Sequence, residues 1–330
     1  MLNNANILIT GGTGSFGKYF VKEILTKFPK IKRMVIYSRD ELKQYEMQRE
    51  YATFNSTALR FFIGDVRDKD RLKSAMNGID LVIHAAAMKQ VTAAEYNPFE
   101  CIKTNILGAQ NVIEASLEAR VKKVLALSTD KAAAPINLYG ATKLASDKLF
   151  IAANNIKGSS NISFSVLRYG NVMGSRGSVI PLFQKLKSSG VLPITDDRMT
   201  RFNITLSEGV ALALECLETS VGGEIFVPKI PSYRILDLAK AISEKSQIKI
   251  IGLRPGEKLH EEMITTSDAH YTKDSGHLYI ILPAGYEDNP KLVDKYQSCV
   301  PVPQNFSYNS HDNDDFLTVD QLKILINKNC

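Results

Sequence analysis

A tyrosine, a lysine and a polar triplet in the middle of the chain are placed to do proton chemistry. Tyr139 and Lys143 are four residues apart, so on a helix the phenol and the ammonium lie on one face. Thr129, Asp130 and Lys131 precede them and follow directly after an apolar run that is typical of a buried strand. A hydroxyl, an acid and a base at a strand end, next to such a helix, indicate a catalytic site that transfers protons.

A glycine-rich turn near the start of the chain indicates a dinucleotide site. The turn follows an expected strand, 7–10, and opens an expected helix, 16–28. Glycines allow a tight turn, a close approach to a pyrophosphate and close packing of the helix on the strand, while the helix N-terminus supplies N–H donors. We therefore predict that a dinucleotide contacts Gly11, Thr13, Gly14, Ser15, Phe16 and Gly17.

The residues after the second expected strand, 34–37, favour NADP over NAD. NAD usually meets an acidic residue here, which binds the ribose 2′-OH. In this chain Ser38 and Arg39 follow the strand and Lys43 lies one helical turn further, and a guanidinium suits a 2′-phosphate. Asp40 is the alternative, because it would serve as an NAD acid if the strand ended later.

The ends of later strands supply the other predicted cofactor contacts. Asp65 and Val66 follow the third strand and would flank the adenine. Small residues follow the fourth strand, where a backbone must pass close to the cofactor. With Tyr139 and Lys143, the predicted cofactor contacts are completed by Ala85, Ala86, Ala87, Lys89 and Asn105, the last of which is expected to order the active-site backbone.

Apolar runs alternate with amphipathic stretches through the first half of the chain, which predicts parallel strands buried on both faces and separated by helices. We therefore predict an α/β fold, a doubly wound parallel sheet of the Rossmann type. His84 ends an apolar strand and is expected to be packed rather than catalytic. The expected strands are 7–10, 34–37, 59–63, 81–84, 124–128 and 164–169, and the expected helices include 16–28 and 98–120.

The alternation loosens after about residue 170. We predict that residues 1–170 bind the cofactor and carry the catalytic residues, and that residues 171–330 form mainly a smaller substrate-binding lobe, with segments crossing between the two. Capping boxes at Thr205 and Thr318 predict helices that begin there. The polar segment 307–315 is predicted to be mobile.

The composition excludes several classes of protein. The 330 residues are 44% hydrophobic with a formal net charge of +6, and scattered basic residues argue against nucleic-acid binding. The cysteines form no CxxC pair and the histidines no cluster, so we expect reduced thiols and no metal. We see no signal peptide and no run that could span a bilayer, and therefore expect a soluble, cytoplasmic protein.

With these motifs placed, the chain resembles the extended short-chain dehydrogenase/reductases, and among them the inverting UDP-N-acetylglucosamine 4,6-dehydratases of pseudaminic acid biosynthesis. The Thr-Asp-Lys triplet separates dehydratases from other members, and retaining relatives carry Asp-x-Glu there and membrane-spanning segments. The tail after about residue 265 matches no motif that we can name. The matching motifs are Thr-Gly-Gly-Thr-Gly-Ser-Phe-Gly, Tyr-Ser-Arg-Asp-Glu-Leu-Lys, Gly-Asp-Val-Arg-Asp, Leu-Ser-Thr-Asp-Lys-Ala, Leu-Tyr-Gly-Ala-Thr-Lys, Arg-Tyr-Gly-Asn-Val and Arg-Pro-Gly-Glu-Lys-Leu-His-Glu.

The resemblance implies an NADP-dependent lyase that acts on UDP-N-acetylglucosamine (UDP-GlcNAc). Tyr139 would take the proton of the C4 hydroxyl, with its pKa lowered by Lys143, and Thr129 would bind the C4 oxygen. Lys131 would take the C5 proton as a neutral amine, which desolvation and cationic neighbours can arrange, and Asp130 would protonate the departing 6-OH. A homo-oligomer and a role in flagellin glycosylation are also implied.

Arginines suit the diphosphate of a UDP-sugar, because a guanidinium binds phosphate bidentately. The Arg-Pro-Gly-Glu turn at 254–257 could equally be structural. Met88 and Lys89 could line the sugar pocket, where Met88 could equally be packing. With Thr129 and Lys131, the predicted substrate contacts are Met88, Lys89, Asn171, Arg176, Arg201, Arg254 and Glu257.

Three alternative functions stay open at this point. A UDP-hexose 4-epimerase needs the same tyrosine, lysine and cofactor but no base at C5, so Asp130 and Lys131 argue against it. A non-catalytic NADP-binding regulator of the same fold commonly lacks the Tyr-x-x-x-Lys pair, which this chain has. A retaining dehydratase would return the C5 proton to the face from which it was taken.

Overall fold

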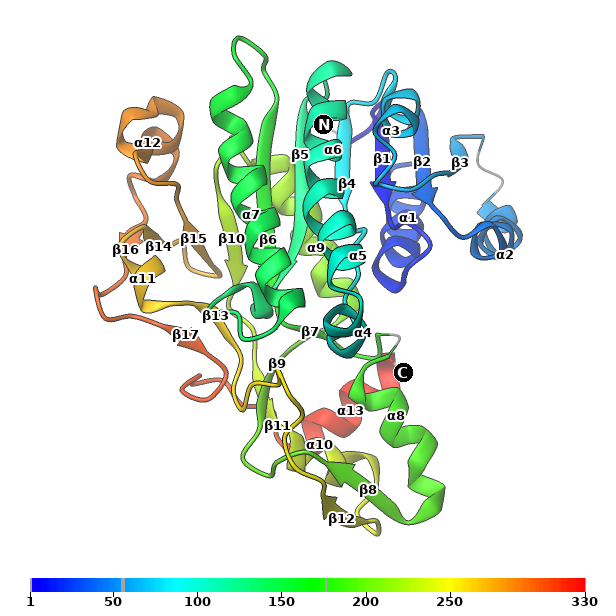
Figure 1. Cartoon of the computed structure of the whole chain (residues 1–330), viewed down its shortest axis with the longest axis vertical. Helices are drawn as coiled ribbons and strands as arrows, with labels where there is room; N and C mark the ends of the chain where they lie inside the picture. The colour runs from blue at the N-terminus through cyan, green and yellow to red at the C-terminus, as the bar shows by residue number, and fades with distance from the viewer. Residues whose placement is uncertain (1, 55–56, 176, 330) are drawn as a thin grey trace.

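A ten-stranded sheet forms the centre of the computed structural model, which describes residues 2–54, 57–175 and 177–329 (Figure 1). The strands from β3 to β10 are parallel, and β15, β14 and β16 extend the sheet in antiparallel pairing. From one edge to the other the strands are β3 (Leu59–Ile63), β2 (Arg33–Ser38), β1 (Asn6–Thr10), β4 (Leu81–His84), β5 (Lys123–Thr129), β6 (Ser163–Tyr169), β10 (Ile225–Pro228), β15 (Leu278–Ile281), β14 (Thr272–Asp274) and β16 (Val300–Pro301).

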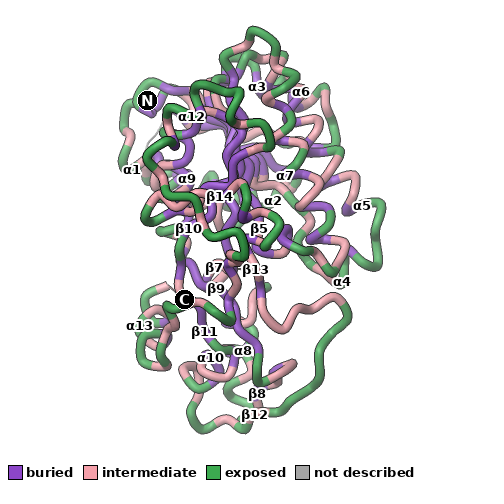
Figure 2. Tube along the Cα trace, turned by 90° about the vertical axis from the view of Figure 1, so that its left-hand side faces the viewer, coloured by how far each residue is buried: buried purple, intermediate pink, exposed green. Residues whose placement is uncertain are grey.

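Helices cover both faces of this sheet, which confirms the predicted doubly wound α/β fold (Figures 1 and 2). On one face, α6 (Gly108–Glu118) packs between α3 (Lys69–Met76) and α7 (Leu138–Ile156). On the other face, α1 (Ser15–Lys27) packs against α9 (Leu206–Thr219). The connections between strands also contain α2 (Glu41–Tyr51), α4 (Val91–Tyr96), α5 (Pro98–Ile102) and a π-helical turn, η2 (Lys103–Leu107).

The parallel strands form because their apolar side chains can be buried on both faces at once. In β5 the run Val124–Leu127 is buried, and every residue of β6 is buried. Each predicted strand is present, with ends that differ by at most one residue from the prediction. The predicted helix 98–120 is present as α5, η2 and α6 in succession.

A smaller lobe lies beyond the carboxyl ends of the parallel strands, at the bottom of Figure 1. It has its own apolar core, which includes Phe183, Leu192, Tyr233 and Leu238. The last helix of the chain packs on it through Leu322. The lobe contains β7 (Asn171–Val172), β9 (Thr200–Ile204), β11 (Ser232–Arg234), the pair β8 (Val191–Ile194) and β12 (Gln247–Ile250), and the helices α8 (Val179–Leu186), α10 (Ile235–Ile242) and α13 (Val319–Asn329).

The tail, which comprises the residues after about 265, runs along both the large sheet and the smaller lobe. Its elements α11 (Thr266–Ala269) and α12 (Pro290–Tyr296) accompany the antiparallel edge of the large sheet. The prediction of a mobile segment at 307–315 is wrong, because β17 (Tyr308–Asn309) pairs with β13 (Glu262–Ile264) and Ser310 is fully buried. The polar side chains of this segment bind the neighbouring backbone and so tie it down, as Asn313 does with the carbonyl of Ile230.

Both predicted capping boxes are present. Thr205 and Glu208 exchange hydrogen bonds at the start of α9. Thr318 and Gln321 do the same at the start of α13, with 2.8 Å between the Thr318 nitrogen and Gln321 Oε1. Within the described residues, we find no helix of the length and apolar character that crossing a membrane would require.

His84 is packed inside the sheet, as the sequence predicted. Its ring is 1% exposed, and its Nδ1 lies 2.9 Å from Thr10 Oγ1 on the neighbouring strand. Burial lowers the pKa of His84 from its ordinary 6.5 to about 3, and the nearby Lys143 ammonium adds to this effect. His84 is therefore neutral in the folded protein at physiological pH.

This burial predicts a specific loss of stability in acid. The unfolded chain protonates His84 below about pH 6.5, whereas the folded chain does not until about pH 3. The contribution of His84 is therefore fully present above pH 6.5 and is lost at up to about 1.4 kcal/mol per pH unit as the pH falls. We expect His84→Asn to flatten the pH dependence of the free energy of unfolding between pH 6.5 and 4.5, measured by urea titration. An unchanged slope would contradict this account.

Candidate active site

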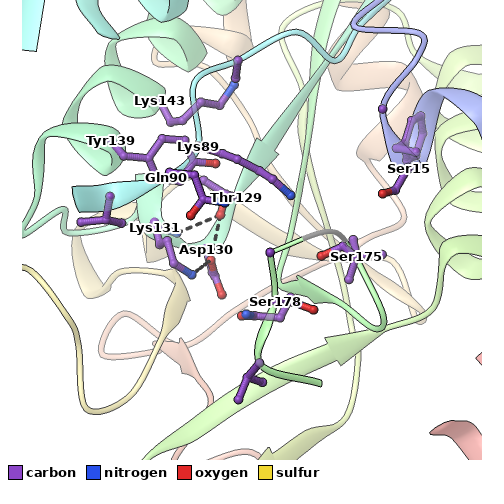
Figure 3. A pocket seen from close by; sticks show the side chains of 18 of the residues that line it. Ser15, Lys89, Gln90, Thr129, Asp130, Lys131, Tyr139, Lys143, Ser175 and Ser178 are labelled. Carbon is purple, nitrogen blue, oxygen red and sulfur yellow. Dashed lines mark hydrogen bonds and ion pairs between the residues drawn. The ribbon is translucent and has the colours of Figure 1, made fainter. Parts of the chain in front are cut away.

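A cleft of about 1160 Å³ separates the carboxyl edge of the parallel strands from the smaller lobe. Figure 3 shows Tyr139, Thr129 and Asp130 together on one side and Ser15 across from them. The predicted residues that line the cleft are Gly11, Thr13, Gly14, Ser15, Phe16, Gly17, Ser38, Arg39, Lys43, Asp65, Val66, Ala85, Ala86, Ala87, Lys89, Thr129, Asp130, Lys131, Tyr139, Lys143, Asn171, Arg201, Arg254 and Glu257.

The glycine-rich turn has the shape that a dinucleotide phosphate requires. Gly11 has a φ of +65°, and a Cβ there would lie 2.9 Å from the backbone of Ala86. A Cβ at Gly17 would collide with the backbone of Gly12, so glycine lets α1 pack tightly on the turn. Gly14 caps α1 without a side-chain acceptor, and the first turn has no acidic residue. The backbone N–H groups in the first turn of α1 can therefore bind the diphosphate of a dinucleotide.

The residues after β2 present a guanidinium rather than a free carboxylate. The strand ends at Ser38, and Asp40 caps α2 by accepting a hydrogen bond from the Lys43 N–H. The Asp40 carboxylate is also paired with the Lys43 ammonium. The Arg39 side chain is 57% exposed, and its guanidinium lies 3.5 Å from the carboxylate of Asp65, which follows the neighbouring strand β3. The Asp40 carboxylate is thus already bound by the backbone N–H and the ammonium of Lys43 in α2.

Tyr139 and Lys143 face the cleft from the first turns of α7. Lys143 Nζ donates to the carbonyl oxygen of Leu127 at 2.8 Å, and burial lowers its pKa, an effect that Asp147 opposes. Burial raises the pKa of Tyr139 to about 12, and the Lys131 ammonium opposes this rise only in part. The surrounding side chains therefore keep the Tyr139 phenol protonated, and the prediction that Lys143 lowers its pKa towards neutral pH stays a prediction.

Lys131 is held between two carboxylates. It lies on a short 3-10 helix, η3 (Asp130–Ala132), and its Nζ is 3.0 Å from Asp130 Oδ1 and 3.0 Å from Glu261 Oε1. Burial alone would lower its pKa, but the two carboxylates outweigh burial and raise the pKa above its ordinary value. Arg201 is a cationic neighbour of the kind expected and lowers the Lys131 pKa, but Asp130 and Glu261 outweigh it, so Lys131 rests as an ammonium.

Asp130 is fully buried and differs from an ordinary surface carboxylate. Its Oδ1 accepts hydrogen bonds from Thr129 Oγ1 at 2.8 Å and from Lys131 Nζ. Its Oδ2 is buried without a hydrogen-bond partner among the described residues. Burial raises the pKa of Asp130, Lys131 opposes this rise, and Glu261 adds to it. Asp130 is therefore the carboxyl group in this cluster that can carry a proton.

A close contact joins Lys131 to helix α7. Gly140 follows Tyr139 on α7, and a Cβ there would collide with the carbonyl oxygen of Lys131. Asn137 caps the helix by accepting from the Gly140 N–H at 2.8 Å. Glycine at this position brings the phenol and the Asp130–Lys131 pair to the same wall of the cleft.

The arginines predicted for the nucleotide lie on the side of the cleft formed by the lobe. Arg201, on β9, is buried and donates to the carbonyl oxygens of Thr200, Leu259 and Lys258. Arg254 is exposed and forms a two-point contact with Glu257, at 2.8 and 3.1 Å. The Arg-Pro-Gly-Glu turn therefore has an internal structural role as well as a place in the cleft.

Two predicted residues do not line the cleft. Asn105, on η2, is 1% exposed, accepts from the Met88 N–H at 2.8 Å and donates to the Met88 carbonyl at 2.9 Å. Asn105 thus orders the backbone of Met88 and has no surface to offer a cofactor, and the Met88 side chain packs against Tyr139 and its neighbours. Arg176 lies outside the described residues.

Several residues that line the cleft were not predicted from the sequence. Their roles could not be inferred from local spacing, because they come from loops and strands of the lobe or from the segment after β4. Glu261 had the clearest indication, since it ends the quoted motif Arg-Pro-Gly-Glu-Lys-Leu-His-Glu. These residues include Gln90, Tyr233, Lys258 and Glu261.

Comparisons with known proteins agree with this geometry. The family described as "Polysaccharide biosynthesis protein" matches residues 7–283. A "UDP-N-acetylglucosamine 4,6-dehydratase (inverting)" from Campylobacter jejuni subsp. jejuni serotype O:23/36 (strain 81-176) is 55% identical, over 99% of this chain and 98% of its own length. A "UDP-glucose 4-epimerase" from Rickettsia prowazekii (strain Madrid E) is 43% identical, over 88% of this chain and 86% of its own length.

A solved structure is similar over the whole chain. The "X-ray structure of Pen from Bacillus thuringiensis" superposes with a TM-score of 0.90 at 38% identity, covering 100% of this chain and 98% of that one. The similarity therefore includes the lobe and the tail as well as the parallel sheet.

Proposed function

This chain belongs to the polysaccharide biosynthesis protein family of extended short-chain dehydrogenase/reductases, and on that premise we propose that it is a lyase, an inverting UDP-GlcNAc 4,6-dehydratase. The observation that carries the proposal is the Asp130–Lys131 pair beside Tyr139, with all three residues lining one cleft. Proton transfer at C4 needs only the tyrosine. The Asp130–Lys131 pair next to it can supply the base at C5 and the acid at C6 that water loss requires in addition.

The reaction begins at C4, because an unactivated C5–H is too weak an acid for any side chain. A ketone at C4 acidifies that bond. Tyr139 would take the proton of the C4 hydroxyl, and Thr129 would bind the same oxygen through its Oγ1. A bound nicotinamide would supply the hydride chemistry, by accepting hydride from C4 and returning it to C6. The residues that fit the dinucleotide are those of the glycine-rich turn, with Lys143 at the ribose.

Lys131 and Asp130 would catalyse the loss of water. Lys131, once its Nζ has passed a proton to Asp130, would take the C5 proton, and Asp130 would deliver its proton to the departing C6 oxygen. Reprotonation of C5 from the opposite face gives the inversion. For the UDP part, we propose Asn171, Arg201, Arg254 and Glu257, with Lys89 near the sugar. Asn171 Oδ1 is buried and has no partner among the described residues, so a substrate donor could satisfy it.

The epimerase relative makes a UDP-hexose 4-epimerase the second candidate. That reaction uses Tyr139 and Lys143 and has no step for Lys131. We also propose that the chain forms a homo-oligomer and that its product enters pseudaminic acid synthesis for flagellin glycosylation. NADP is the proposed cofactor, since the Arg39 guanidinium at the end of β2 is 57% exposed, although it lies 3.5 Å from Asp65, while the Asp40 carboxylate is paired with Lys43.

Replacing Lys131 tests the dehydratase proposal against the epimerase. We expect Lys131→Ala to lower the rate of water loss from UDP-GlcNAc by at least about 10²-fold, because general acid–base groups contribute on that order. Binding of NADP, measured by calorimetry, should be retained. Lys122→Ala, which changes an exposed lysine just before the start of β5, is the matched control and should leave the rate unchanged. Full activity of Lys131→Ala would remove Lys131 from the mechanism.

The cofactor proposal is tested at Arg39. Loss of a charge-assisted contact to a 2′-phosphate should weaken NADP binding by about 10-fold or more, while NAD binding changes little. Calorimetric titration of Arg39→Ala with both cofactors measures this difference, and Arg49→Ala, at the far end of α2, is the control. Equal losses for NADP and NAD, or wild-type affinity for NADP, would refute the assignment.

A further inference from the structure

We propose that Glu261 is a positioning residue for the dehydration step: it holds the Lys131 ammonium in place and stays ionised while a proton passes between Lys131 and Asp130. This inference rests on the proposed function, since it concerns the same step. It assigns different duties to the two carboxylates that flank Lys131, and it gives the tail of the chain, for which the sequence offered no motif, a place in the active site.

The geometry makes Glu261 an equal partner of Lys131. Its Oε1 and Asp130 Oδ1 each lie 3.0 Å from Lys131 Nζ, and the two carboxylates come from segments far apart in the sequence. Glu261 is 2% exposed, whereas the Lys131 side chain keeps 24% of its surface exposed. An ammonium fixed from two sides by buried carboxylates cannot swing away from its place in the cleft.

The surroundings of the two carboxylates differ. Glu261 Oε1 also lies 3.7 Å from Arg201 Nε, and Lys258 is a further cation nearby. Burial would raise the pKa of Glu261, but Lys131 and Arg201 outweigh burial and lower it. Asp130 is paired with Lys131 alone among these cations, and burial raises its pKa. When their surroundings shift the pKa values of two neighbouring carboxyl groups in opposite directions, the group with the higher pKa holds the proton and the other stays charged.

The tail fixes the backbone of Glu261. The Glu261 N–H donates to Ser310 Oγ at 2.9 Å, and the Ser310 N–H donates to the Glu261 carbonyl at 2.8 Å. Ser310 Oγ also lies 2.7 Å from Thr200 Oγ1 on β9. Ser310 follows β17, which pairs with β13, so the segment predicted to be mobile is a strap that holds Glu261 against Lys131.

Lys131 and Glu261 belong to a cluster of charged and titratable groups that come from both sides of the cleft. They come from η3 and α7 on the side of the sheet, and from β9, β11 and the segment before β13 on the side of the lobe. They are Asp130, Lys131, Tyr139, Arg201, Tyr233, Glu257, Lys258 and His260.

The proton movements then balance over one dehydration. A proton passes from Lys131 Nζ to Asp130 Oδ1, which leaves a neutral amine and a neutral acid. The amine takes the C5 proton, the electrons of the C5–H bond form the C5=C6 bond, and the C6–O bond breaks. Asp130 gives its proton to the departing oxygen, which leaves as water. Lys131 is again an ammonium and Asp130 a carboxylate, and Glu261 has remained charged throughout.

Glu261→Gln tests this inference, because it keeps the shape of the side chain and removes its charge. Without the second carboxylate, the proton shared by Lys131 and Asp130 is lost more readily. We expect the alkaline fall in the rate of water loss from UDP-GlcNAc to move to lower pH by about one to three units, the usual effect of an opposite charge at this distance. A merely structural role would lower the rate equally at every pH.

Two further variants complete the test. Glu261→Asp keeps the charge and should return the alkaline fall to its wild-type pH. Glu262→Gln changes the next residue, which interacts with Lys258 and Asp268, and should leave the fall in place. An alkaline fall at the wild-type pH in Glu261→Gln, or an equal shift in Glu262→Gln, would overturn the inference.

A readout without turnover separates this inference from the proposed function. The pKa of the Lys131 ammonium can be followed by NMR of ¹⁵N-labelled lysine, with Lys131→Ala to assign the signal. If wild-type protein leaves UDP-GlcNAc unchanged, the proposed function fails, yet a lower Lys131 pKa in Glu261→Gln still supports the role of Glu261. An unchanged Lys131 pKa refutes that role whatever the substrate is.

Discussion

The site depends on one interaction, the Lys131 ammonium held between Asp130 and Glu261. Two carboxylates this deeply buried are stable only because a cation lies between them, and removal of one partner would leave an uncompensated charge. The pairing requires three parts of the chain to meet: the end of β5, the segment before β13, and the tail strand β17. The smaller lobe is thereby fastened to the carboxyl edge of the large sheet at the point where Lys131 and Tyr139 line the cleft.

The parallel sheet brings the other groups to the same edge. The glycine-rich turn follows β1, the guanidinium of Arg39 follows β2, and the small residues Ala85 to Ala87 follow β4. The triplet Thr129-Asp130-Lys131 is at the end of β5. Because all these strands point in one direction, their carboxyl ends lie side by side, and a ligand in the crevice can touch every one of them. Gly140 then brings Tyr139 close to the backbone of Lys131.

Local patterns were enough to predict the strands, the helix caps and the glycine-rich turn between β1 and α1, because each depends on neighbours in the sequence. The protonation of Lys131 could not be predicted, since it is set by Glu261, which is distant in the sequence and near in space. The strap at 307–315 escaped prediction because its strand is short and polar and shows no periodicity. Asn105 was predicted to contact the cofactor, because the spacing of residues along a helix does not show that the Asn105 side-chain amide is hydrogen-bonded to the backbone of Met88.

The most direct test of the central proposal is NMR of the product formed from UDP-GlcNAc and the wild-type protein in D₂O, with no added reductant. An inverting dehydratase should yield a 4-keto-6-deoxy sugar with deuterium at C5 and the L-arabino configuration. The cofactor should end in its initial oxidation state. The same product in the D-xylo configuration would contradict inversion, and UDP-N-acetylgalactosamine formed without loss of water would contradict dehydration altogether.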